Sequence, residues 1–337
     1  MIKTLTSWRG IFALCIVCFH FAMHEFDQMT YAGVTFFFML SGFLVCLRYD
    51  DLTPFSKFYK RRLWRIFPLH WIVLAAMILL DLVIIHKFKY GWDLPLHVVL
   101  LQSWSPDPAI IYNYSIHSWF LSSLLFCICV TPLLFKFFKH SERRVSWAVM
   151  LVACAIVVVV NLIANETWHS YLYVMPLTRV VDYALGMLLG MALRERQEQP
   201  RVSMTRATII EVAVLLIFAI FIALHASGNA VALKLGHSAI WWIPVSLLIV
   251  TCTILNGNEG WVGKLLSLKP LVWLGTISFE IYLLQKLANN LYCYVVAPFS
   301  AHYGMFIYDY SFIGTLPLLI IMAWAVHKLM KLITPAK

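Results

Sequence analysis

The stretch SWRGIFALCIVCFH, from Ser7 to His20, is apolar from Ile11 to Phe19 and carries Arg9 near one end and His20 at the other. About twenty consecutive apolar residues cross a bilayer as a helix. A charged side chain within that layer costs a few kcal/mol or more, so such residues face the protein interior and mark functional sites. We therefore interpret this stretch as part of a membrane helix with two functional side chains.

The rest of the chain has the same character. Of its 337 residues, 62% are hydrophobic and only 12% are charged, which excludes a soluble protein of this size. Several apolar runs reach spanning length, and the short alternating segments of a membrane barrel are absent. The 8 cysteines lie mainly in apolar runs and are interpreted as small buried hydrophobic residues. The sequence predicts an all-α, polytopic membrane protein with one transmembrane domain over residues 1–337.

Ten spanning helices are expected. Their predicted ranges are 8–24, 31–49, 62–85, 117–138, 145–163, 175–193, 207–226, 238–256, 271–296 and 309–332.

Lysine and arginine predict the orientation of these helices. Most of the 26 Lys and Arg residues lie at one set of helix ends and loops, and such residues mark the cytoplasmic side. Both termini are therefore predicted to be cytoplasmic, in a multi-pass protein of the cell (inner or cytoplasmic) membrane. The net charge of +10 is interpreted as this orientation signal, and no nucleic-acid partner is expected.

Arg9 and His20 are predicted to share one face of their helix. Eleven residues at about 100° each return to within about 20° of the starting direction, and they rise about 16 Å. Taken alone, Arg9 could be a snorkelling anchor and His20 a hydrogen-bonded packing residue; the shared face favours a functional pair. His24 and Glu25 raise the possibility of a metal site, but a third ligand is unclear, and we expect no metal.

Five stretches resemble the acyltransferase-3 family of integral membrane acyltransferases, in the order found in that family. Arg9 and His20 match its Arg-x10-His signature, and Arg61, Arg62 and Arg65 match its Arg-Arg-x-x-Arg motif. Three further helices carry similar runs, namely GVTFFFMLSGFLV from Gly33, RVVDYALGMLLG from Arg179 and LGTISFEIYLLQ from Leu274. At Leu124, Leu125 and Gln285 the chain differs from many relatives, which carry acidic residues or, at the last position, histidine.

The resemblance implies transfer of an acyl group, usually acetyl, from cytoplasmic acyl-CoA to a hydroxyl of an envelope carbohydrate or lipid-linked glycan. No tightly bound cofactor is implied, and acyl-CoA is the donor substrate. Arg61, Arg62 and Arg65, with Arg9, would bind the CoA phosphates, because the guanidinium fork pairs with phosphate oxygens. His20 would be the general base, and an acyl-histidine intermediate is a less economical alternative.

Further candidates come from depth along the helices. Asp182 could orient His20 as part of the catalytic group or simply pair with Arg179, one turn earlier. Glu280 is a catalytic candidate because it lies within a predicted span. Gly186 and Gly190 have the four-residue spacing of closely packed membrane helices.

Support or acceptor-binding roles are expected for Arg179, Trp119, Ser41, Tyr282 and Gln285. The outer loop 86–116, rich in aromatic residues, is either a sugar-binding surface or an interfacial anchor. Two other functions are conceivable for a polytopic membrane protein. A transporter or flippase would use Arg179, Asp182 and Glu280 to line a solute path, but no internal repeats support it. An inactive scaffold conflicts with the presence of the motif residues.

Overall fold

The computed structural model describes residues 2–21, 26–86, 91–194, 202–303 and 311–333, and these ranges contain helices and loops without a β-strand. The predicted all-α class is confirmed. Each of the ten predicted ranges overlaps one helix or two consecutive helices, and residues 22–24 of the first range and 309–310 of the last lie outside the described residues. The main helices are α1 (Lys3–His20), α2 (Asp27–Arg48), α3 (Phe55–Leu80), α6 (Ser118–His140), α7 (Arg143–Ile163), α9 (Pro176–Arg194), α10 (Met204–Ala226), α12 (Trp242–Ile254), α14 (Lys269–Thr276), α15 (Ser278–Tyr303) and α17 (Ser311–Ile333).

Shorter elements connect them. They are η2 (Asp81–Ile85), α4 (Leu94–Val98), η3 (Gln102–Trp104), α5 (Pro108–Ile111), α8 (Glu166–Val174), α11 (Ala230–Leu235), η4 (Ala239–Trp241) and α13 (Trp261–Leu266).

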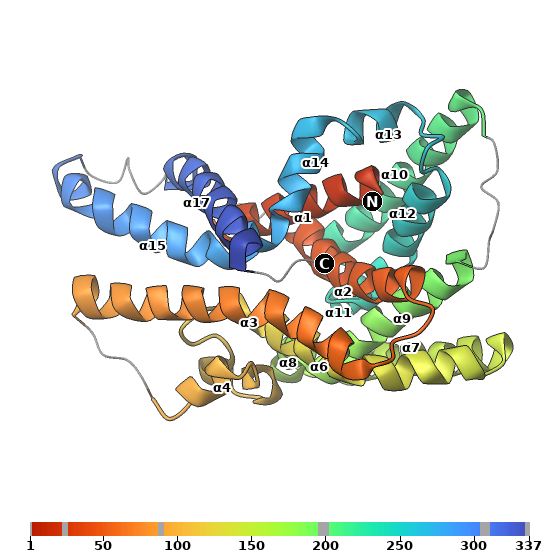
Figure 1. Cartoon of the computed structure of the whole chain (residues 1–337), viewed down its shortest axis with the longest axis horizontal. Coiled ribbons are helices and arrows are strands. Elements are labelled where there is room, and N and C mark those ends of the chain that lie inside the picture. The colour runs from red at the N-terminus through yellow and green to blue at the C-terminus, as the bar shows by residue number, and fades with distance from the viewer. Residues whose placement is uncertain (1, 22–25, 87–90, 195–201, 304–310, 334–337) are drawn as a thin grey trace.

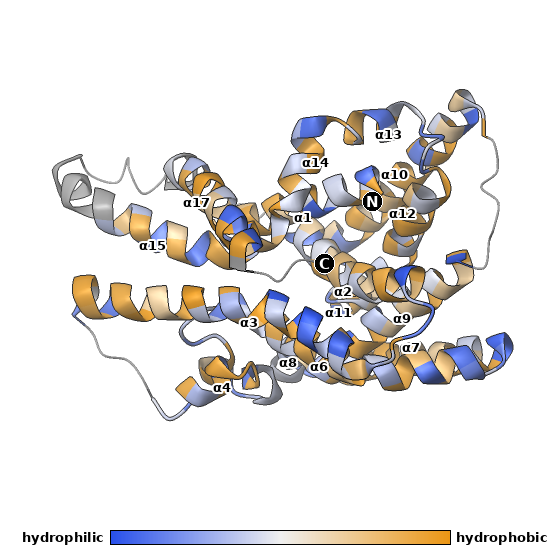
Figure 2. Cartoon of the chain, viewed as in Figure 1, coloured by the Kyte–Doolittle hydropathy of each residue, from blue (hydrophilic) through white to orange (hydrophobic). Residues whose placement is uncertain are grey.

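Seven of the described helices are long and apolar enough to cross a bilayer, and the bent pair α14 and α15 would be an eighth. The apolar segment Ala239–Ile254 is shorter, and α1 carries Lys3, Arg9 and His20 among its 18 residues. Only 22% of the apolar window of α7, and the same share of α10, is buried inside the protein. Many exposed side chains of these helices are apolar, for example Val152 and Ile156 of α7 and Leu216 and Ile220 of α10, as expected where lipid is the solvent. Figure 2 colours much of the helical ribbon as hydrophobic. The number of crossings and the cytoplasmic position of the termini remain predictions.

The centre of the molecule is the contact between α2 and α9 (Figure 1). A Cβ atom on Gly42 would overlap the carbonyl oxygen of Tyr183, and a Cβ on Gly186 would overlap that of Met39. Gly190 approaches the carbonyl oxygen of Phe43 in the same way. The predicted close packing through Gly186 and Gly190 is therefore confirmed, with α2 as the partner helix.

Helix α1 packs against α2 on one side and against α14 and α15 on another. Gly10 and Gly275 let α1 and α14 approach at backbone distance. The chain then bends by 66° between α14 and α15. Helix α15 continues beside α3 and pairs with α17, as the blue helices at the left of Figure 1 show. This arrangement leaves the face of α1 that carries Arg9 next to α3 and α15.

Candidate active site

A cavity of ≈ 130 Å³ lies between α1, α2, α3, α6, α9 and α15. Five residues predicted from the sequence line it: Arg9, Ser41, Arg62, Arg65 and Tyr282. Much of the remaining wall is apolar, from residues Ile16, Val34, Phe37, Leu40, Leu44, Ile66, Phe120, Leu124, Ile128 and Phe279. Guanidinium groups therefore adjoin a narrow apolar space.

The arginine cluster comes from two helices. Arg62 and Arg65 are three residues apart on α3 and share the face that turns to the cavity. Arg9 on α1 lies close enough to Arg65 to interact with it electrostatically. Arg61 points elsewhere, since its Nη1 lies 3.4 Å from the hydroxyl of Tyr49 and it is not among the residues that line the cavity. The structure thus brings three of the four predicted donor-binding arginines together.

Glu280 lies at this arginine end and is buried. It interacts electrostatically with both Arg9 and Arg65, and its Oε1 lies 2.7 Å from Nδ1 of His327 on α17. Its Oε2 has no hydrogen-bond partner. The sequence did not single out His327, because only the fold brings α17 against the first turn of α15. Glu280 is therefore a neighbour of the arginine cluster.

His20 lies beyond the cavity, one turn after Ile16 on the same face of α1. Its imidazole meets the ring of His117 edge to face, with the ring centroids 4.3 Å apart. The side chain of Gln285 lies next to the same imidazole. Tyr282 connects this group to the cavity, because its ring lines the cavity while its hydroxyl donates a hydrogen bond of 3.0 Å to the carbonyl oxygen of His117.

His117 was missed by the sequence reasoning. It lies two residues before Trp119, at the start of α6, and this position beside a predicted site residue was the available signal. Both of its ring nitrogens are buried without a hydrogen-bond partner, as is Oε1 of Gln285. Buried polar atoms are nearly always paired in proteins, so such exceptions call for an explanation.

Asp182 and Arg179 form a separate, fully buried pair. Nη1 of Arg179 donates to Oδ2 of Asp182 over 2.8 Å, and Oδ1 accepts from the Ser238 hydroxyl at 2.5 Å and the Trp242 indole at 2.6 Å. Arg179 also donates to the carbonyl oxygens of Tyr173 and, on the far side, His237. Of the two alternatives for Asp182, the contacts favour pairing with Arg179 over orienting His20.

Trp119 and Ser41 have ordinary contacts. The Trp119 ring is buried, 4.9 Å from that of Tyr173 and 5.9 Å from the guanidinium carbon of Arg179. The Ser41 hydroxyl donates to the carbonyl oxygen of Phe37, one turn earlier, over 2.7 Å. Trp119 thus supports the Arg179 pair, while Ser41 forms part of the cavity wall.

The outer loop is held by its own polar groups. Asp93 accepts from Asn113 at 2.8 Å and from the Tyr114 hydroxyl at 3.0 Å, and His97 is bonded to the carbonyl oxygen of Ile110 at 2.8 Å. Burial alone would raise the pKa of Asp93, but the hydrogen bonds from Asn113 and Tyr114 bring that pKa below its usual value. Burial lowers the pKa of His97. These contacts make the loop a folded cap on α3 and α6.

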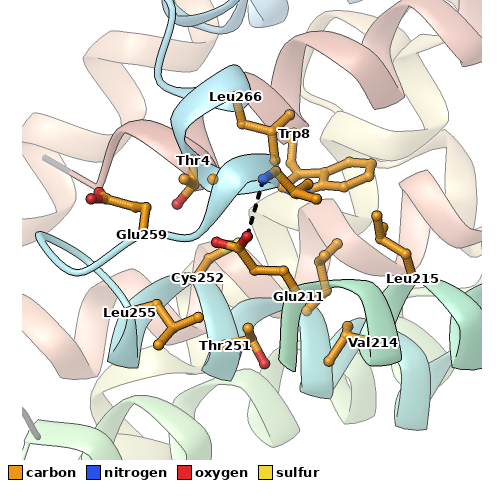
Figure 3. Close-up of a pocket in the computed structure, with 13 residues that line it drawn as sticks. Thr4, Trp8, Glu211, Val214, Leu215, Thr251, Cys252, Leu255, Glu259 and Leu266 are labelled. Atoms are coloured by element: carbon orange, nitrogen blue, oxygen red, sulfur yellow. Dashed lines mark hydrogen bonds between the residues drawn. The ribbon is translucent and has the colours of Figure 1, made fainter. Parts of the chain in front are cut away.

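A second cavity, of ≈ 20 Å³, lies between α1, α10, α12 and α13 and contains Glu211 (Figure 3). The Glu211 carboxylate accepts from the backbone N–H groups of Gly260 at 2.9 Å and Val262 at 3.1 Å. A buried carboxylate satisfied in this way fixes the turn before α13, so we assign Glu211 a structural role.

Within the described residues, no group of three or more His, Cys, Asp or Glu side chains is arranged to hold a metal ion. His24 and Glu25, considered above as ligands, lie outside the described residues.

Comparisons with known proteins identify relatives that match most or part of the chain. The model of the acyltransferase-3 family, described as an acyltransferase domain, matches residues 2–327. The chain is 28% identical over 227 residues to "Acyltransferase MdmB" of Streptomyces mycarofaciens, covering 57% of this chain and 58% of that protein. It is 25% identical over 295 residues to "Putative acetyltransferase ORF330" of Acidianus two-tailed virus, covering 85% and 83%.

A third relative is "Putative O-acetyltransferase SACOL0978" of Staphylococcus aureus (strain COL), 23% identical over 308 residues. The match covers 84% of this chain but only 50% of that protein, so the chain spans about half the length of the staphylococcal relative. No solved structure matches the chain. Because the family model covers nearly the whole sequence, the chain belongs to the acyltransferase-3 family of integral membrane acyltransferases.

Proposed function

We propose that this membrane acyltransferase moves an acetyl group from acetyl-CoA to a hydroxyl of an envelope carbohydrate or lipid-linked glycan. One observation carries the proposal: an arginine-lined cavity leads along a single face of α1 towards His20. The names of the relatives, which include acetyltransferases and O-acetyltransferases, support acetyl as the group transferred.

The phosphates of the donor would bind to the arginines, and its pantetheine arm would fit into the narrow cavity. Arg9, Arg62 and Arg65 offer planar donors that match phosphate oxygens. The narrow, largely apolar cavity suits the thin pantetheine arm, with the phosphates left at the arginine end.

The reaction would take place beside His20. Neutral His20 accepts the proton of the acceptor hydroxyl as its oxygen attacks the thioester carbon. The new C–O bond forms, the C–S bond breaks, and His20 returns the proton to the thiolate of CoA. The reaction needs no proton donor or acceptor other than the two substrates and His20.

Because CoA is found in the cytoplasm, the acyl group would be transferred from the cytoplasmic side of the membrane towards the outer side. Arg9, Arg62 and Arg65 lie on the predicted cytoplasmic side, and His20 follows Arg9 by about three helical turns along α1. The enzyme would load its donor from the cytoplasm and acylate an acceptor on the outer side or in the outer leaflet, with membrane lipids around it.

Purified protein in oriented proteoliposomes tests the proposal. We expect CoA release that depends on an envelope glycan fraction, measured with a thiol reagent, only when acetyl-CoA is on the side carrying Arg62. Acetylation of the glycan should be visible by mass spectrometry. Equal turnover with acetyl-CoA on the other side would contradict the direction, and no CoA release from either side would contradict the function.

A further inference from the structure

The backbone of His117 is fixed by a hydrogen bond, but its imidazole makes none among the described residues. The Tyr282 hydroxyl binds its backbone carbonyl oxygen at 3.0 Å, and the residue is only 2% exposed. Its ring lies nearly perpendicular to that of His20, at 87°. Both ring nitrogens lack a hydrogen-bond partner, although burying an unpaired polar group destabilises a protein.

Packing alone does not explain this choice of residue. A phenylalanine in the same place would fill the space without burying two unpaired nitrogens. Another ring beside it is that of Tyr282, with the centroids 5.8 Å apart, and the Tyr282 hydroxyl is already bonded to the backbone of His117. Among the described residues, His20 is the ring neighbour that is also an imidazole, and the nitrogens of His117 are not reached by solvent.

We propose that His117 is a positioning residue that acts through His20, an inference that rests on the proposed function. When His20 carries the proton of the acceptor hydroxyl, the two rings turn from their edge-to-face contact, and the unprotonated nitrogen of His117 accepts a hydrogen bond from the second N–H of His20. This contact stabilises the imidazolium, as the orienting group does behind other catalytic histidines.

The proton balance of the reaction is unchanged by this role. His20 takes the proton as the C–O bond forms and gives it to the thiolate as the C–S bond breaks. His117 is neutral before and after, and it contributes only a hydrogen bond whose strength rises with the charge on His20.

Other groups that face the pair must be kept constant in a test. Lys286 on α15 is close enough to both imidazoles to interact with them electrostatically. Arg9 lies on α1 about three turns away. Gln285 lies beside His20 with Oε1 unpaired, so it is the rival candidate for the same hydrogen bond.

The experiment compares pH profiles of kcat/KM for the full chain in proteoliposomes. His117→Phe keeps a ring but removes both nitrogens, and His117→Gln returns an acceptor oxygen. Phe19→Leu is the matched control, because Phe19 also packs on the His20 ring, at 5.2 Å, and carries no nitrogen.

We expect His117→Phe to lower kcat at least tenfold and to shift the acid limb about one unit lower in pH, with the KM for acetyl-CoA unchanged. The shift follows because an imidazolium that loses its acceptor gives up its proton more readily. His117→Gln should restore part of both effects, and Phe19→Leu should leave the acid limb in place.

Several outcomes would overturn the inference. An unshifted limb in His117→Phe would do so, as would equal behaviour of the Phe and Gln variants. A limb that moves in Gln285→Leu and not in His117→Phe would assign the hydrogen bond to Gln285. If the unaltered protein releases no CoA, both the proposed function and this inference are wrong. If the unaltered protein and His117→Phe turn over equally well, only this inference is wrong.

Discussion

Two buried polar groups in this membrane protein are built in opposite ways. Around Arg179 and Asp182, both carboxylate oxygens and the three guanidinium nitrogens have hydrogen-bond partners. Around His20, both nitrogens of His117 and Oε1 of Gln285 have none. The first group is complete in the protein alone, while the second has unused hydrogen-bonding capacity.

We expect the first group to stabilise the fold and the second, which lies next to the cavity, to take part in the reaction. A complete network specifies one arrangement of helices, and removing one member leaves a buried charge. An incomplete one lowers stability, which proteins accept at functional sites. Substitutions in the first group should therefore act on folding, and substitutions in the second on turnover.

The largest effect is expected for Asp182→Ala. It leaves the Arg179 charge buried without its partner, which costs about 3–5 kcal/mol, a large part of a typical stability of about 5–15 kcal/mol. The yield of monodisperse protein and its thermal midpoint in detergent measure this loss.

The double variant Arg179→Met with Asp182→Leu is the control, because it removes both charges. It should recover part of the lost stability. If Asp182→Ala is stable but inactive, the result would instead support a catalytic role for Asp182.

His20→Ala should have the opposite signature. The protein should fold and bind a non-hydrolysable acetyl-CoA analogue, while glycan-dependent CoA release falls by about 10²–10⁴-fold because the base is lost. Near-normal turnover would remove His20 from the role of base.

Arg62→Ala and Arg65→Ala should weaken donor binding about tenfold or more each, because each removes charge-assisted hydrogen bonds to phosphate. Affinity for the glycan acceptor should not change. Titration with the same acetyl-CoA analogue measures the effect. Arg61→Ala is the matched comparison, since Arg61 faces Tyr49 and not the cavity; equal losses in all three variants would mean that the cavity does not define the donor site.

The smallest effect concerns the outer loop, where the carboxylate of Asp93 accepts two hydrogen bonds and Nδ1 of His97 has no partner among the described residues. The folded pKa values of Asp93 and His97 both lie below their usual values, so the unfolded loop binds protons first as the pH falls. The contribution of His97 is present above about pH 6.5 and is lost as the pH falls below it, while that of Asp93 is lost only below about pH 4.

Hydrogen exchange of residues 91–117 should therefore show weaker protection at pH 5 than at pH 7, after correction for intrinsic rates. His97→Gln keeps a donor for the Ile110 carbonyl and removes the titrating group, so protection should differ less between pH 5 and pH 7. Equal protection of the unaltered loop at both pH values would contradict the prediction.

The sequence predicted the helices well because membrane helices depend on local composition. Apolar runs located all ten helical ranges, and the four-residue spacing of Gly186 and Gly190 identified a close helix contact. The bend between α14 and α15 was not predicted, because both halves are apolar and the break near Gly275 depends on packing against Thr6 of α1.

The site was predicted in part for the same reason. Arg9 and His20 share a helix, so their common face follows from helix geometry. His117 and His327 enter through contacts between helices far apart in the sequence, and no spacing rule links them to His20 or Glu280. The choice between two roles for Asp182 likewise required knowledge of Ser238 and Trp242.

The glycine contact between α2 and α9 also bears on how the donor fits its cavity. Because Gly42 and Gly186 bring the two backbones together, Ser41 and Tyr183 belong to a part of the cavity wall that has a fixed position. Other parts of the wall are formed by longer side chains, including Leu124 and Ile128 of α6. A wider passage for the pantetheine arm is therefore expected to need smaller residues at these two positions of α6.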